Sequence, residues 1–136
     1  MSDDSKSIVQ RLYREGFNQM RLEILDELVA EEFEDHGSLP GQGPGREGLK
    51  QRVQMMRAGF PDQVLVIQDI VAEADLVAIR VISRGTHRGS MMGFPPTGRA
   101  FEIEGMDFYR VQDGSIVEHW AQYDVPALMR QLGADA

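Results

Sequence analysis

The stretch from residue 99 to 124 constrains the fold of this chain most strongly, because it reads as two long strands joined by a tight turn. Asp113-Gly114 lies between two apolar runs, and Asp-Gly in that setting is a strong β-hairpin signal. Asp107 interrupts the first strand, and the second carries a run of polar and aromatic side chains that begins at His119. A plain core hairpin would not need these polar residues, so they are candidates for a functional site.

The register of the hairpin decides whether these residues meet, and the sequence allows two registers. A two-residue loop, Asp113-Gly114, places Asp107 opposite Trp120. A three-residue loop in which Gly114 forms a bulge in the left-handed region places Asp107 opposite His119 on one face, with Cβ atoms roughly 4.5–5.5 Å apart. We favour the bulged loop, because it brings the carboxylate beside the imidazole and explains both residues at once.

Composition limits the classes of function. The 136 residues suit one domain, residues 1–136, with a single core. A net charge of −8 argues against nucleic acid or an anionic membrane surface as a partner. The chain has no cysteine, which excludes disulfides and thiolate sites. Its three histidines, His36, His87 and His119, lack the i, i+4 helical spacing of a typical metal-binding pair, so we expect no metal site. We find no signal peptide or membrane-spanning run and expect a cytoplasmic protein.

Periodicity along the chain predicts helices first and strands afterwards. Helical spacing of apolar residues predicts one helix to about Met20, a second from Leu22 to Phe33, and a third over residues 46–60. Asp35-His36 is expected as a short strand between the second and third helices. The remaining elements are strands at 64–71 and 76–85, the hairpin, and a C-terminal helix at 125–132. This order indicates an α+β fold in which a strongly curved, mostly antiparallel sheet wraps over three helices and leaves a pocket.

Asp107 and His119 are the strongest candidates for chemistry. The apolar residues around them indicate that the hairpin is largely buried, and a buried carboxylate is unfavourable unless it is paired. A carboxylate that fixes an imidazole is a common arrangement for acid–base work. The alternative is that His119 is a core histidine satisfied by a neighbour and Asp107 a surface charge. We favour the catalytic interpretation.

Other residues are candidates for binding a ligand, each with a structural alternative. Tyr13 and Phe17 on the first helix either line the cavity or simply fill the core. Trp120, the only tryptophan, either contacts substrate or anchors the sheet. Residues near or on loops that could rim or cover a pocket complete the set of candidate substrate-binding residues: His36, His87, Met92 and Phe94.

The order of elements and several local strings together resemble the SnoaL-like polyketide and ester cyclases, a branch of the NTF2-like superfamily. The strings are Phe60-Pro61-Asp62, Ala78-Ile79-Arg80, Gly85-Thr86-His87, Thr97-Gly98-Arg99, Gly105-Met106-Asp107, Ile116-Val117-Glu118-His119-Trp120 and Gln131-Leu132-Gly133. The resemblance implies a cone-shaped α+β fold with a mixed sheet, a deep apolar cavity, no cofactor and homodimers packed through the sheet.

The resemblance also implies a reaction class, intramolecular aldol ring closure of a polyketide ester with an aspartate as acid/base. That aspartate would directly follow the His-Trp pair, where this sequence has Ala121. We therefore expect acid–base chemistry on a hydrophobic carbonyl compound through Asp107 and His119. The alternatives are a non-catalytic binding module, a related protein associated with hydroxylation, and a structural protein whose pocket is filled by side chains such as Met55, Met92 and Phe94.

Overall fold

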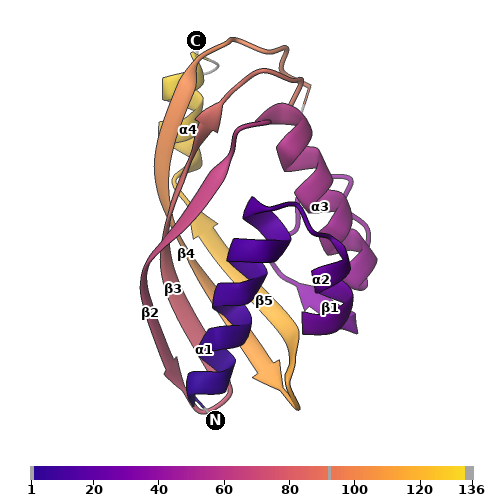
Figure 1. Ribbon diagram of the computed structural model, residues 1–136. Coiled ribbons are helices and arrows are strands. Elements are labelled where there is room, and N and C mark those ends of the chain that lie inside the picture. Colours follow the sequence, from indigo (N-terminus) through magenta and orange to yellow (C-terminus); the bar gives the residue numbers. More distant parts are fainter. Residues whose placement is uncertain (1, 92, 134–136) are drawn as a thin grey trace.

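The computed structural model describes residues 2–91 and 93–133, which form four α-helices, one π-helical segment and five strands (Figure 1). None of the described helices is long and apolar enough to cross a membrane. The elements along the chain are α1 (Ser2–Arg11), η1 (Leu12–Asn18), α2 (Glu23–Leu28), β1 (Val29–Asp35), α3 (Gly45–Gly59), β2 (Val64–Glu73), β3 (Leu76–Thr86), β4 (Ala100–Gln112), β5 (Ser115–Tyr123) and α4 (Val125–Leu132).

The five strands form one mixed sheet in the order β1-β5-β4-β3-β2, in which only β1 and β5 run parallel. The helices α1, α2 and α3 cover one face of this sheet, and α4 lies beside the end where β4 begins (Figure 1). Buried and exposed residues alternate along almost the whole of β4, so one face of the strand packs under the helices and the other faces outward. This confirms the predicted α+β fold.

The predicted second helix is too long. It ends at Leu28, and Val29 and Phe33 are instead the buried residues of β1. The error has a physical cause, because a spacing of four residues puts two side chains on the same face of a helix and also of a strand. The short strand expected at Asp35-His36 is the end of this longer strand.

The favoured three-residue loop of the hairpin is wrong, and neither Trp120 nor His119 is the residue opposite Asp107. The turn is the two-residue loop, since Gln112 pairs with Ser115 and Val111 with Ile116. A bulge then lies on β5 rather than at the turn, because Arg110 pairs with Glu118 and leaves Val117 without an opposite residue. The bulge shifts the remaining pairs by one residue.

As a result of this shift, Asp107 is opposite Ala121, and His119 is opposite Tyr109. Ile116 and His119 are three residues apart, yet both are buried on the helix-covered face. In a regular strand an odd spacing would send one of them outward. The bulge at Val117 is therefore what turns His119 toward the helices.

Candidate active site

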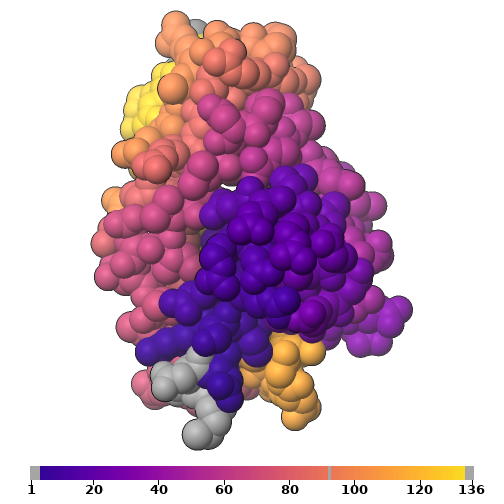
Figure 2. All heavy atoms as spheres, viewed as in Figure 1, coloured from indigo at the N-terminus to yellow at the C-terminus, as the bar shows by residue number. Residues whose placement is uncertain are grey.

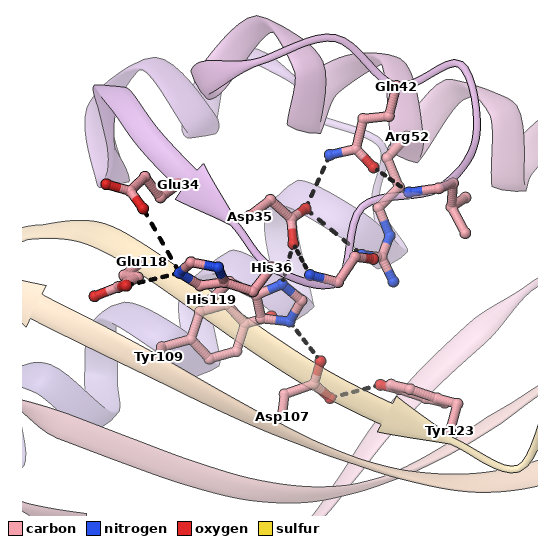
Figure 3. Close-up of polar contacts among 12 residues, drawn as sticks. Glu34, Asp35, His36, Gln42, Arg52, Asp107, Tyr109, Glu118, His119 and Tyr123 are labelled. Carbon is pink, nitrogen blue, oxygen red and sulfur yellow. Dashed lines mark hydrogen bonds and ion pairs between the residues drawn. The ribbon is translucent and has the colours of Figure 1, made fainter.

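His119 lies between two carboxylates. Its Nε2 is 2.7 Å from Asp107 Oδ1, and its Nδ1 is 2.8 Å from Asp35 Oδ1 (Figure 3). Asp107 and His119 contact each other diagonally across the β4–β5 ladder. Asp35 is the last residue of β1 and pairs with His119 of β5. Only 3 % of His119 and 2 % of Asp107 is exposed. The carboxylate and imidazole thus meet inside the protein, although the register differs from the predicted one.

The geometry favours an imidazolium at His119. An ionised carboxylate only accepts hydrogen bonds, so both ring nitrogens must donate to satisfy both contacts. Burial lowers the pKa of His119, but the hydrogen bonds and charges of Asp107 and Asp35 outweigh it, and the net pKa is raised. Burial alone would raise the pKa of Asp35. Hydrogen bonds from His119, the Gln42 side chain and the Gly37 N–H outweigh this effect and hold that pKa well below its usual range.

Asp35 is itself held in place by the segment that follows β1. Its Oδ1 accepts a hydrogen bond from the Gly37 N–H at 2.9 Å, and its Oδ2 accepts one from Gln42 Nε2 at 2.8 Å. Arg52 on α3 places a guanidinium nitrogen 3.7 Å from the same Oδ2. Two carboxylates, one imidazolium and one guanidinium leave no net charge in the cluster, which lowers the unfavourable energy of burying it.

Three tyrosines surround the Asp107 side of this cluster. Tyr123 donates its hydroxyl to Asp107 Oδ2 at 2.6 Å, and the hydroxyls of Tyr13 and Tyr109 are 2.6 Å apart (Figure 3 shows Tyr109 and Tyr123). The Tyr109 ring also stacks on His119, with ring centroids 4.6 Å apart. Burial and the negative charge of Asp107 raise the pKa of all three phenols. They therefore stay protonated and act as hydrogen-bond donors.

These groups open onto a cavity of about 300 Å³ between the helices and the sheet. Asp107, His119 and the three tyrosines line it together with mostly apolar side chains, among them residues of α3, β4 and α4. The volume is at the lower end of the range of small-molecule sites. In Figure 2 the surface is indented between the indigo N-terminal segment and the magenta segment after α3. Phe17 of η1 and Leu65 of β2 are among the residues that line the cavity.

The structure brings four of the predicted site residues together at this cavity. Asp107 and His119 form the polar wall, and Tyr13 and Phe17 line the cavity from η1. The rings of Tyr13 and Phe17 also contact each other edge to face, with centroids 4.8 Å apart. Tyr13 belongs to the main hydrophobic core as well, so core packing and cavity lining are not exclusive here.

His36 and Trp120 lie on the other face of the sheet. Each directly follows an inward-facing residue, Asp35 or His119, and neighbouring side chains of a strand point to opposite faces. Their rings stack on each other with centroids 5.1 Å apart, and Arg110 lies 5.7 Å from the Trp120 ring. This position separates both residues from the cavity, so we no longer place them in the substrate site.

His87 and Phe94, two candidates near loops, also lie away from the cavity wall. His87 is buried against the ring of Phe60, and its Nδ1 accepts a hydrogen bond from the Thr97 N–H at 3.3 Å. Phe94 is 38 % exposed. Met92 is outside the residues that the structure describes. Met91 lines the cavity instead and packs on Gly59 at the end of α3.

Sequence reasoning missed several polar residues of the site. Tyr109 is two residues after Asp107 on β4 and therefore lies on the same face of the strand, so strand alternation alone would have predicted its position. Tyr123 was visible as a polar residue of the second strand. Asp35 had no local signal, because its contact with His119 depends on the parallel pairing of β1 and β5.

Within the part of the chain that the structure describes, a cluster on the outward face of the sheet combines side chains of the kinds that bind metal ions. The ligand atoms of Glu34, His36 and Glu118 lie within 4.8 Å of one another on the outward face. His36 Nε2 is 2.7 Å from a Glu118 carboxylate oxygen, and Arg110 donates to the other oxygen at 3.1 Å. Because these groups already pair with one another and with Arg110, we interpret them as a surface ion-pair cluster.

The sequence of this chain matches a known protein family over most of its length. A family model described as SnoaL-like polyketide cyclase matches residues 7–132. The nogalonic acid methyl ester cyclase of Streptomyces nogalater is 29 % identical over 120 residues, which cover 87 % of this chain and 90 % of that protein.

Two solved structures are similar over almost the whole chain. Wild-type IdmH from Streptomyces antibioticus has a TM-score of 0.82 and 42 % identity, covering 95 % of this chain and 98 % of that one. TsrD from Streptomyces laurentii has a TM-score of 0.88 and 26 % identity, covering 97 % and 96 % of the two chains.

Proposed function

Because this chain belongs to the SnoaL-like polyketide cyclase family, we propose that it is a cyclase-type enzyme that performs acid–base chemistry on an apolar carbonyl compound bound in the cavity. Asp107 is the proposed base, and it removes a proton from the carbon next to a substrate carbonyl. Two relatives are named as cyclases of nogalonic acid methyl ester and of aklanonic acid methyl ester, which supports a polyketide-like ester as the substrate class.

The position of Asp107 opposite Ala121 is the observation that carries this proposal. The family resemblance puts the acid/base aspartate at position 121, where this chain has alanine. Asp107 is the residue directly across the ladder, and both side chains face the cavity. Cβ atoms of directly opposed residues are roughly 4.5–5.5 Å apart. A carboxylate on β4 can therefore reach much of the space that one at position 121 would occupy.

His119 and Asp35 support Asp107 as positioning residues. The imidazolium holds the Asp107 carboxylate in position through their 2.7 Å contact, and Asp35 fixes the ring from the other side. A carboxylate can act as the base when hydrogen-bond donors stabilise the enolate. In the Tyr13–Tyr109 pair one hydroxyl donates to the other, so one phenolic proton remains for a ligand oxygen.

The proposed reaction balances within the substrate and Asp107. Asp107 takes the α-proton, and the electron pair of the C–H bond becomes the enolate. The enolate carbon then forms a C–C bond to a second carbonyl carbon of the same molecule, whose oxygen becomes an alkoxide. The alkoxide takes the proton back from Asp107, which restores the carboxylate.

The test is exchange of the α-protons of 1-tetralone in D₂O, followed by NMR, because exchange needs only the first step. We expect the wild-type protein to catalyse exchange and Asp107→Asn to lose about 10²–10⁴-fold in rate. Asp113→Asn in the exposed turn is the matched control. Unchanged exchange in Asp107→Asn would overturn the assignment. Binding of the ketone to the wild type without exchange would favour the binding-module alternative.

We also propose that the protein forms a homodimer through the outward face of the sheet. A row of directly opposed apolar residues crosses four strands: Val71 on β2, Ala78 on β3, Phe108 on β4 and Trp120 on β5. Val71 is 63 % exposed and Phe108 is 47 % exposed. An exposed apolar row of this kind is typical of an interaction surface. The charge change Phe108→Glu should give a monomer in light scattering, whereas an unchanged mass would contradict this interface.

A further inference from the structure

Two buried polar side chains, Gln63 and Ser83, line the cavity away from the Asp107 cluster. Gln63 is 8 % exposed and Ser83 is 4 % exposed. Gln63 Nε2 donates to Ser83 Oγ at 3.2 Å. The turn after α3 fixes the Gln63 backbone, whose N–H donates to the carbonyl of Phe60 at 3.0 Å. The two side chains thus form a positioned pair rather than a mobile surface group.

The hydrogen-bonding capacity of this pair is mostly unused. A carboxamide offers two donors and an acceptor oxygen, and a hydroxyl offers one donor and two lone pairs. Within residues 2–91 and 93–133, the side chains of Gln63 and Ser83 have only each other as hydrogen-bond partners. If the amide is turned over, Ser83 donates to Gln63 and the NH₂ group faces the cavity instead. In either orientation the pair has a donor or acceptor left for a ligand in the cavity.

The strand register gives the separation of this pair from the catalytic cluster. Asp107 is opposite Ile79 on β3, and Ser83 is four residues further along the same strand and on the same face. At about 3.3 Å per residue, the two positions are about 13 Å apart along the sheet. The cavity lining beside Ser83 is apolar and includes Ile103, the residue opposite Ser83 on β4, and Phe101.

We propose that Gln63 and Ser83 form a second binding subsite, which hydrogen-bonds an oxygen at the far end of an elongated and otherwise apolar carbonyl compound. This inference rests on the proposed function in one respect, because the same cavity must hold the substrate. The chemistry of the pair fits a hydroxyl or carbonyl group and not an ionised group, since neither side chain is charged. The substrate class is therefore a rigid, rod-like ketone or ester with oxygen functions at both ends.

The test compares two ketones that differ only at the far end, 6-(4-hydroxyphenyl)-1-tetralone and 6-phenyl-1-tetralone, by calorimetric titration. The wild-type protein should bind the hydroxylated ketone about three- to ten-fold more tightly, which is the value of one net hydrogen bond. Gln63→Met with Ser83→Ala should abolish this preference, and Ser83→Ala alone should reduce it. Gln68→Met on the exposed part of β2 is the matched control and should keep it.

Equal affinity of the wild type for both ketones, failure of both to bind, or an unchanged preference in the folded double variant would each overturn the inference. The same titration on Asp107→Asn separates it from the proposed function. That variant should lose α-proton exchange and keep the preference for the hydroxylated ketone. A wild type that shows the preference without any exchange would contradict the catalytic proposal alone.

Discussion

Asp107 and Ala121 are directly opposite residues of the β4–β5 ladder, and both face the cavity. The family resemblance implies an acid/base aspartate at position 121, where this chain has alanine, and Asp107 provides a carboxylate directly across the ladder. Because the two positions lie on adjacent strands, a carboxylate at either position can reach much of the same region of the cavity. The acid/base role can then be tested by moving the carboxylate.

We expect Asp107→Ala to lower the rate of α-proton exchange of 1-tetralone by about 10²–10⁴-fold. The double variant Asp107→Ala/Ala121→Asp should exchange at least about 10-fold faster than Asp107→Ala. Rescue should be incomplete, because residue 121 and His119 are two apart on one strand, about 7 Å, and the 2.7 Å contact with Nε2 would be lost. NMR exchange rates check this, with circular dichroism to confirm folding. A folded double variant as inactive as Asp107→Ala would contradict the cross-strand interpretation.

The ion pairs of His119 predict a pH dependence of stability. The folded pKa of His119 is raised above 6.5, so its contribution is complete below that pH and is lost as the pH rises through the raised value. The folded pKa of Asp35 is lowered from 3.8, so its contribution is complete above that pH and is lost on acidification. Together they stabilise the fold most between about pH 4 and 6.5.

Urea unfolding of the wild type and of His119→Gln, at pH 5.5 and at alkaline pH, measures this effect. The wild type should lose unfolding free energy on going to alkaline pH, whereas the variant should lose much less, because glutamine does not titrate. Parallel curves for the two proteins would show that His119 is not the group responsible.

Asp35→Asn tests the positioning role of the second carboxylate. Asparagine can still accept a hydrogen bond from His119 Nδ1 but removes one of the two charges that raise the pKa of the imidazole. We expect slower exchange and an alkaline limb of the pH–rate profile that moves to lower pH. A purely structural role would lower the rate at every pH without this movement. Glu34→Gln, one residue earlier and exposed, is the control.

The inward position of Asp107 and the order of the elements were predictable, because both depend on local patterns. Alternation along β4 places Asp107 and Tyr109 on one face, and apolar spacing indicates the helices. The contact between Asp107 and His119 was predicted for the wrong reason. A bulge at Gly114 was expected, whereas the bulge is at Val117, a β-branched residue that gives no turn or bulge signal.

The contact between Asp35 and His119 was not predictable from one sequence. Asp35 reaches the ring only because β1 pairs in parallel with β5, 84 residues away along the chain. No local spacing encodes such a pairing, and the assignment of Val29 and Phe33 to a helix hid most of the strand. Trp120 could have been placed correctly, because it directly follows His119 and alternation along the strand puts the two side chains on opposite faces.

Gly105 provides the last prediction, because its lack of a side chain makes room for Tyr123. The two residues are opposite each other, and a Cβ at position 105 would lie 2.2 Å from the Tyr123 ring. Gly105→Ala must therefore displace the ring and break the 2.6 Å bond from its hydroxyl to Asp107. We expect a loss of about 1–3 kcal/mol in unfolding free energy from overpacking, together with slower α-proton exchange.

Tyr123→Phe is the matched variant, because it removes the hydroxyl and keeps the ring. It should lose about 1.5–3 kcal/mol, the range for a hydrogen bond to a charged group, and should show a similar decrease in exchange. Urea unfolding and NMR exchange of both variants measure these effects. If Gly105→Ala exchanges at the wild-type rate while Tyr123→Phe does not, the ring has kept its contact with Asp107 and the packing argument is wrong.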